Sequence, residues 1–279
     1  MKTPHSQVAV SRSQGLVLSW SCLTVAVAVV VIFVVLAGSA IAGPFEEGLT
    51  VYNKGDFAKA VQIWRPLAEK GDPKAQVYLG DMYRKAQGLP QDTAEAAKWY
   101  RRAAEQGHAE AQNNLGLMYS HGLQVPQDYA EAVKWYRRAA EQGDVNGQNN
   151  LGNMYHNGLG VPQNYSEAVK WYCRAADQGE AAGQFNLGAM YYNGQGVPQD
   201  YVQAYMWFNL AASRHRFSEN RDRAVKARDE VAGLMTPAQI AEAQRMAREW
   251  KPTGHQVIKR QEIDKSRVIQ VKPRPTQQK

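Results

Sequence analysis

Residues 111–143 read AQNNLGLMYSHGLQVPQDYAEAVKWYRRAAEQG, and variants of this unit recur along the chain with a period of 36 residues. Four series of residues keep that period. They are Leu79, Leu115, Leu151 and Leu187, each followed by glycine; Trp99, Trp135, Trp171 and Trp207; Pro90, Pro126, Pro162 and Pro198; and Gly71, Gly107, Gly143 and Gly179. Units of this length, each packed on its neighbours, are typical of repeat solenoids.

The unit itself predicts two helices joined by a short connection. Leu115 and Met118 have the spacing of one face of a helix. Gly122 stands where a left-handed residue ends a first helix. Asp128 and Glu131 have the spacing of a capping box at the start of a second helix. We therefore expect one helical hairpin per unit.

The repeats are expected to fill residues 45–216. Their predicted boundaries are 45–74 for a divergent first unit, followed by 75–110, 111–146, 147–182 and 183–216. After Trp207 the pattern changes to two further amphipathic helices. We interpret residues 217–250 as a helical C-terminal cap, because a solenoid needs a non-repeating end to cover its last exposed face.

The central units follow the pattern AxxxLGxMYxxGxxVPQDYxEAxKWYxRAAxQG, which resembles the Sel1-like repeat, a relative of the tetratricopeptide repeat. The resemblance covers about residues 45–216. It implies an all-α fold, a right-handed α-solenoid of Sel1-like helical hairpins. It also implies a non-enzymatic scaffold or adaptor for other proteins, often in the bacterial envelope.

An enzymatic alternative comes from cysteine-rich Sel1-like proteins that are described as β-lactamase-like hydrolases. Their units carry a cysteine pair, whereas the repeats of this chain contain only Cys173. This departure disfavours a hydrolase. The six histidines show no metal-ligand spacing, and the glycine-containing loops are inter-helix turns rather than phosphate-binding loops. We therefore expect no catalytic residue, no metal and no cofactor.

Resemblance to tetratricopeptide repeats places a binding groove on the concave face, along the first helix of each hairpin. The positions in this groove vary between units while the framework repeats. The candidate partner-binding residues are Arg84, Lys85, Asn113, Leu117, His121, Asn149, Asn153, His156, Phe185 and Tyr192. We expect these residues to be free of packing constraints and to bind an extended protein or peptide segment. The alternative is a solvated polar face without a dedicated ligand.

Residues 1–42 have the layout of a secretory signal peptide or a membrane anchor. Two basic residues precede a long uncharged stretch, in which Cys22 to Ala37 is almost wholly apolar. Small residues at Ala40 and Ala42 suit cleavage after Ala42, whereas an uncleaved stretch of this length could span a bilayer. Both interpretations place the repeats outside the cytoplasm, as a periplasmic or secreted protein or as a single-pass anchored one. A secreted protein that acts on a host is a further alternative.

The net charge of +7 is carried by the two ends of the chain. Residues 251–279 hold eight basic and two acidic residues, and residues 1–42 hold two basic residues and no acidic one. The repeats are therefore close to neutral, and we do not expect nucleic acid as a partner, because no basic element suits a nucleic-acid groove. The tail is expected to be disordered and to contact anionic lipid weakly. The sequence does not indicate an oligomeric state.

Overall fold

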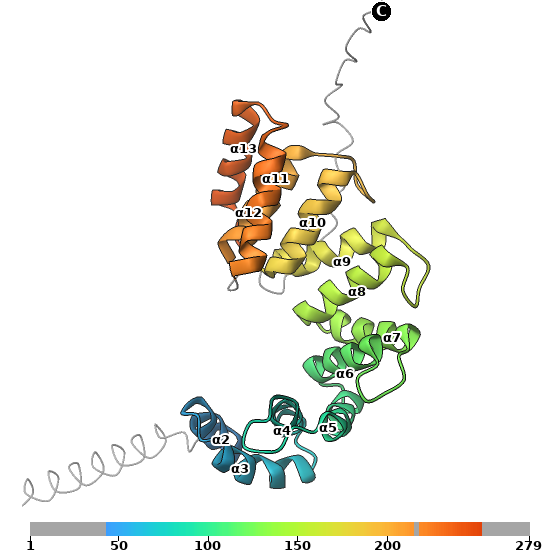
Figure 1. Ribbon diagram of the computed structural model, residues 1–279, viewed down its shortest axis with the longest axis vertical. Coiled ribbons are helices and arrows are strands. Elements are labelled where there is room, and N and C mark those ends of the chain that lie inside the picture. Colours follow the sequence, from blue (N-terminus) through green and yellow to red (C-terminus); the bar gives the residue numbers. More distant parts are fainter. Residues whose placement is uncertain (1–42, 215–217, 253–279) are drawn as a thin grey trace, which may run out of the picture.

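The computed structural model describes residues 43–214 and 218–252. The predicted signal or anchor lies outside these residues, and so does the basic tail apart from its first two residues. The described part contains twelve helices and no strand, and successive helices form hairpins along an arc (Figure 1). The predicted all-α solenoid is therefore confirmed. No helix of the described part combines the length and the apolar character needed to cross a membrane.

The helices pair in chain order into five hairpins. The first helices of the hairpins are α2 (Pro44–Asn53), α4 (Pro73–Lys85), α6 (Ala109–His121), α8 (Val145–Asn157) and α10 (Ala181–Asn193). The second helices are α3 (Phe57–Glu69), α5 (Thr93–Glu105), α7 (Tyr129–Glu141), α9 (Tyr165–Asp177) and α11 (Tyr201–Arg214). The remaining helices, α12 (Ser218–Ala232) and α13 (Pro237–Glu249), pack against α11 at the C-terminal end.

The helix ends follow from local sequence. Gly122 ends α6 with a φ of 66°, in the left-handed region. The Asp128 carboxylate accepts a hydrogen bond from the backbone N–H of Glu131 at 3.0 Å and so caps α7. The predicted capping box also requires a return bond from the Glu131 side chain to the backbone N–H of Asp128, and this part of the prediction is wrong. The Glu131 carboxylate pairs with Nζ of Lys134 at 2.5 Å instead, because that lysine lies one turn further along the same face.

The Leu-Gly pairs let the two helices of a hairpin approach closely. A Cβ atom on Gly116 would lie 2.7 Å from Cδ1 of Tyr136 on the facing helix, and one on Gly152 would lie 2.6 Å from the ring of Tyr172. Glycine inside a helix costs about 1 kcal/mol relative to alanine. The cost is offset here because a buried aromatic ring occupies the space that the missing side chain leaves.

A buried glutamine ladder joins neighbouring hairpins. Gln112 donates from Nε2 to the carbonyl oxygen of Ala104 in the preceding hairpin at 3.1 Å. Its Oε1 accepts a hydrogen bond from Nε2 of Gln142 at 2.7 Å. The same two bonds recur one unit earlier and one unit later. Because an unpaired buried amide is costly, this ladder holds adjacent hairpins in one register.

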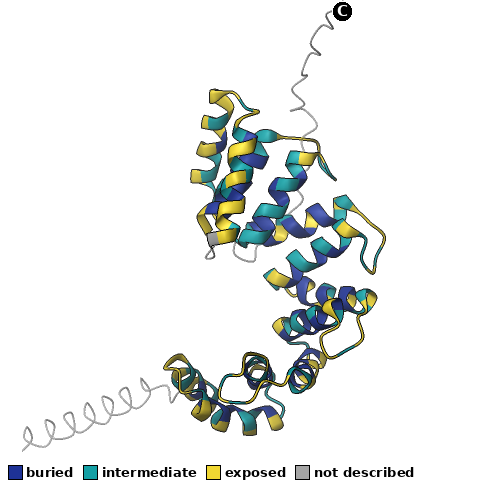
Figure 2. Cartoon of the chain, in the orientation of Figure 1, coloured by how far each residue is buried: buried dark blue, intermediate teal, exposed yellow. Residues whose placement is uncertain are grey.

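The first helices line the open side of the arc. In Figure 1, α4 and α6 lie on this side, with α5 and α7 farther out. Side chains of adjacent first helices also bond directly, as Asn150 does to Asn113 at 2.9 Å. In Figure 2 the inter-helix loops are largely exposed, while buried residues lie where helices face one another. We call the surface of α4, α6, α8 and α10 on the open side the inner face.

Candidate functional site

All ten predicted groove residues lie on the four first helices α4, α6, α8 and α10. Arg84, Lys85 and His121 are exposed. Six are half-buried, namely Leu117, Asn149, Asn153, His156, Phe185 and Tyr192. Asn113 is only 6% exposed, so the expected freedom from packing constraints is wrong for this residue. Its burial follows from the contact between α6 and α8, which the sequence does not show.

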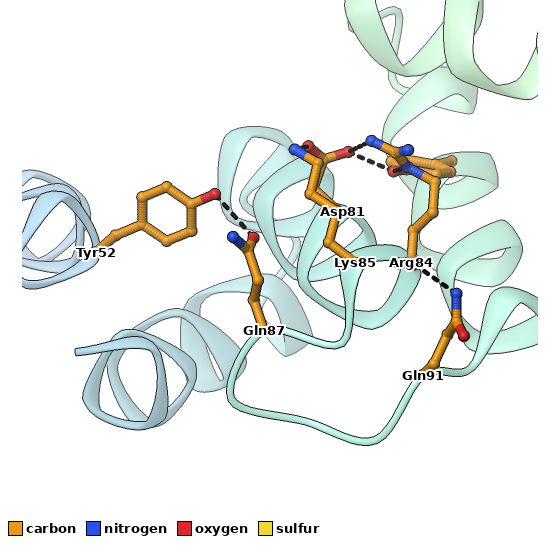
Figure 3. Close-up of polar contacts among 7 residues, drawn as sticks. Tyr52, Asp81, Arg84, Lys85, Gln87 and Gln91 are labelled. Carbon is orange, nitrogen blue, oxygen red and sulfur yellow. Dashed lines mark hydrogen bonds and ion pairs between the residues drawn. The ribbon is translucent and has the colours of Figure 1, made fainter. Parts of the chain in front are cut away.

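At the N-terminal end of the inner face, Arg84 and Lys85 surround Asp81 (Figure 3). The Asp81 carboxylate accepts hydrogen bonds from Nζ of Lys85 and from the Tyr100 hydroxyl, each at 2.5 Å. Arg84 donates from Nε to the same hydroxyl at 3.2 Å. Burial alone would raise the pKa of Asp81, but these hydrogen bonds and the two positive charges outweigh burial and lower the pKa. The cluster therefore stays ionised and carries one positive charge in excess.

Asparagines occupy the middle of the inner face. Asn150 donates from Nδ2 to Oδ1 of Asn113, and Asn186 donates to Asn149, both at 2.9 Å. Asn186 also donates to Oδ1 of Asn153 at 3.3 Å. We call these five residues the asparagine ladder. The Nδ2 groups of its three acceptor residues have no hydrogen-bond partner among the described residues, and those of the half-buried Asn149 and Asn153 are available to a ligand.

The sequence-based set missed two members of this ladder. Asn150 and Asn186 stand 36 residues apart and form a series with Asn114. That series is the signal that could have identified them. The series belongs to the repeated framework, whereas the predicted groove positions are those that vary between units.

The two groove histidines lie in different surroundings. His121 is exposed near the end of α6, while the His156 ring lies 5.4 Å from the ring of Tyr165. Within the described ranges, no group of three or more His, Cys, Asp or Glu side chains could hold a metal ion.

Aromatic residues replace the amides at the C-terminal end of the inner face. The Phe185 ring packs on the ring of Phe208, with centroids 5.3 Å apart. Arg223 of α12 reaches over Phe185, with its Cζ 5.5 Å from the ring centroid. Sequence reasoning missed Arg223, because α12 lies beyond the repeats and no periodic signal points to it.

Cys173 occupies a position that arginine holds in the three preceding units. In those units the arginine donates to a tyrosine hydroxyl of the next hairpin: Arg65 to Tyr83, Arg101 to Tyr119 and Arg137 to Tyr155. Burial, with a smaller effect of the Asp177 charge, raises the pKa of the Cys173 thiol to about 12. A thiol that stays protonated at neutral pH is a poor nucleophile, so Cys173 does not suit the hydrolase alternative.

The family model described as the Sel1 repeat matches four consecutive segments, 73–108, 109–144, 145–180 and 181–215. Together they cover just over half of the chain. They correspond to the four hairpins from α4–α5 to α10–α11.

Solved structures give similar matches. A Sel1 repeat protein from Oxalobacter formigenes is 28% identical with a TM-score of 0.56, and the match covers 74% of this chain and 99% of that one. A protective antigen of uropathogenic Escherichia coli with an SLR fold is 25% identical with a TM-score of 0.42, over 77% of this chain and 62% of that one. No curated protein matches the chain.

Proposed function

Because the chain belongs to the Sel1 repeat family, whose members are generally non-enzymatic protein-interaction scaffolds, we propose that it binds an extended segment of a partner protein along its inner face. The bound segment would run over α4, α6, α8 and α10. Repeat solenoids commonly use their concave surface in this way.

The observation that carries this proposal is the asparagine ladder. The Oδ1 atoms of Asn113, Asn149 and Asn153 are used within the protein, which orients their Nδ2 groups without occupying them. An extended backbone offers a carbonyl oxygen at every residue. Amide donors held in fixed positions on successive helices can therefore bind a backbone largely irrespective of its side chains.

A variant that blocks the inner face tests the proposal. Alanine in place of the ladder asparagines is unsuitable, because the ladder also joins adjacent hairpins and its loss would lower stability. Leu117 is half-buried on α6 and is not part of the ladder. Leu117→Lys would place a long cation on the inner face and leave the ladder intact.

The matched control is Lys134→Ala, on the exposed side of α7. We expect Leu117→Lys to lose cross-linking to its partner in intact cells and Lys134→Ala to keep it, with melting temperatures of both close to that of the parent. Partner capture that survives in Leu117→Lys would argue against binding along the inner face.

We also propose that the repeats function outside the cytoplasm. The support is sequence-based: residues 13–45 are uncharged and follow two basic residues. A C-terminal fusion to alkaline phosphatase should be active, because that enzyme needs an oxidising compartment to form its disulfides. Amino-terminal sequencing would separate cleavage after Ala42 from an uncleaved anchor. An inactive but intact fusion would contradict the location.

The basic tail is proposed to add a weak contact with anionic lipid. Its eight basic residues outnumber two acidic ones, and each basic residue near an anionic surface contributes about 1 kcal/mol. Removal of residues 253–279 should reduce co-sedimentation with phosphatidylglycerol vesicles. Equal sedimentation with and without the tail would contradict this role.

A further inference from the structure

A small cavity lies at the C-terminal end of the inner face, between α10 and α12. It measures about 130 Å³ and is lined by Ala182, Phe185, Asn186, Asn220 and Arg223. It continues the inner face, because Asn186 belongs both to the cavity and to the asparagine ladder. A backbone bound to the ladder would therefore lead towards this cavity.

One wall of the cavity is apolar. In three preceding units a tyrosine hydroxyl bonds to a polar residue of the first helix, as Tyr172 does to Asn153 at 2.7 Å. In the last unit Phe208 and Ala189 occupy these two positions, so both polar groups are missing. Phe185 packs against Phe208 and presents a half-buried ring to the cavity.

The cationic side of the cavity adjoins the apolar one, because Cζ of Arg223 lies 5.5 Å from the centroid of the Phe185 ring. Arg223 is exposed, and no carboxylate of the described residues lies within ion-pair distance of it. Helices α8 and α10 contain no Asp, Glu, Lys or Arg, and the Glu180 carboxylate at the start of α10 caps the backbone N–H of Gly183. Glu219 and Asp222 of α12 line a neighbouring shallow pocket together with Arg223. The unpaired Arg223 guanidinium can therefore form a charge-assisted hydrogen bond with a carboxylate of a ligand in the cavity.

We propose that the cavity binds the C-terminal residue of the partner segment, with its α-carboxylate on Arg223 and an apolar side chain against Phe185. A C-terminal apolar residue carries a carboxylate and an apolar side chain on one Cα, and the cationic and apolar sides of the cavity also adjoin each other. An internal Asp or Glu supplies the charge but leaves the apolar wall uncovered. This inference rests on the proposed function, since the preceding backbone of the ligand lies along the asparagine ladder.

Fluorescein-labelled peptides of serine and asparagine provide the probe, with fluorescence anisotropy on the full chain as the readout. One peptide ends in leucine with a free carboxylate, a second ends in leucine amide, and a third has an internal aspartate and an amidated end. We expect the free acid to bind about tenfold more tightly than either amidated peptide, because a charge-assisted hydrogen bond is lost in both.

Two variants test whether Arg223 causes the preference for the free acid. Arg223→Gln should abolish the preference for the free acid, whereas Arg221→Gln, which removes an exposed arginine paired with Asp222, should keep it. Both substitutions are at exposed positions, so the melting temperature should not change.

The inference is overturned if acid and amide bind equally, if the internal aspartate substitutes fully for the terminus, or if Arg223→Gln keeps the preference. It is also overturned if no peptide binds while partner cross-linking remains sensitive to Leu117→Lys. That last pair of results would leave the proposed function intact. Loss of sensitivity to Leu117→Lys would instead remove the proposed function itself.

Discussion

Two residues adopt a backbone conformation that other units assign to glycine. Ala86 ends α4 with a φ of 55°, where Gly122 and the later units have glycine. Gln124 has a φ of 59° at the position that Gly160 holds one unit later. A residue with a Cβ atom in the left-handed region is disfavoured by about 1–2 kcal/mol. These two units therefore carry strain that the others avoid.

Ala86→Gly and Gln124→Gly should each raise the free energy of unfolding by about 1 kcal/mol, because relief of strain exceeds the entropy that glycine adds to the unfolded chain. Urea denaturation measures the change. The opposite substitution, Gly158→Ala, should lower stability. A loss of stability in both glycine variants would contradict the interpretation.

The aromatic residue facing each Leu-Gly pair is matched to a partner on the first helix. The pairs are Tyr100 with Asp81, Tyr136 with Ser120, and Tyr172 with Asn153, each joined by a hydrogen bond. Phe208 needs no such partner, and Ala189 provides none. Each of the three tyrosine hydroxyls is thus paired, and the last unit, which has Phe208 in place of tyrosine, has the apolar Ala189 in place of a polar partner.

Phe208→Tyr should therefore lower the free energy of unfolding by about 1–3 kcal/mol, because its hydroxyl would be buried without a partner. The double variant Phe208→Tyr with Ala189→Asn recreates the pair found at Tyr172 and should recover most of the loss. Urea denaturation of the single and double variants checks both statements. Equal stability of the two variants would contradict the matching.

Helix α6 begins without the side-chain cap that α4, α8 and α10 have. Asp72, Asp144 and Glu180 each accept a hydrogen bond from a backbone N–H of the helix that follows. His108 stands at this position before α6 and makes no such bond, and its Nδ1 is buried without a partner in the described part of the chain. Burial and the charge of Lys74 lower the pKa of His108, against smaller effects of the two aspartates.

His108→Asp adds the missing cap and should raise the free energy of unfolding by about 1 kcal/mol. In the parent, the folded pKa of His108 lies below the unfolded value of about 6.5, because the folded protein disfavours the protonated ring. The folded state therefore keeps its full stability above that pH and loses stability as the pH falls. The urea midpoint of the parent should decline more steeply from about pH 7 to about pH 5 than that of His108→Asp. His121→Asn, which changes an exposed histidine, should decline like the parent.

For the molecule as a whole, stability at the C-terminal end depends on one tryptophan after the last helix. Trp250 packs edge-on against Trp207, with ring centroids 6.0 Å apart, and Arg214 lies 4.7 Å from the Trp250 ring. In the preceding unit, Arg174 covers Trp171 from the same helix. The last repeat has Leu210 in place of that arginine, so Trp250 covers its tryptophan instead.

Trp250→Ala should release α13 and expose the end of the solenoid, at a cost of about 2–3 kcal/mol. Native-state hydrogen exchange should show lost protection in α13 and α11 and unchanged protection in α4 to α7, because repeats depend mainly on their nearest neighbours. A uniform loss along the chain would indicate that the solenoid unfolds as one unit.

Sequence alone determined the hairpins and their ends, because these depend on residues close together in the chain. The 36-residue period marks the units, Gly122 ends a helix through its own backbone conformation, and Asp128 caps the helix that follows it. Such local features recur in most copies, so a single unit was sufficient to describe most of the fold.

Only the tertiary structure decided which inner-face residues are used within the protein and which are available. The bond from Asn150 to Asn113 joins residues 37 positions apart, and it depends on how closely α6 and α8 approach. Arg223 reaches Phe185 only because α12 packs beside the last repeat. Contacts between units and with a non-repeating end depend on curvature, which arises from packing along the whole arc and is not encoded in any one unit.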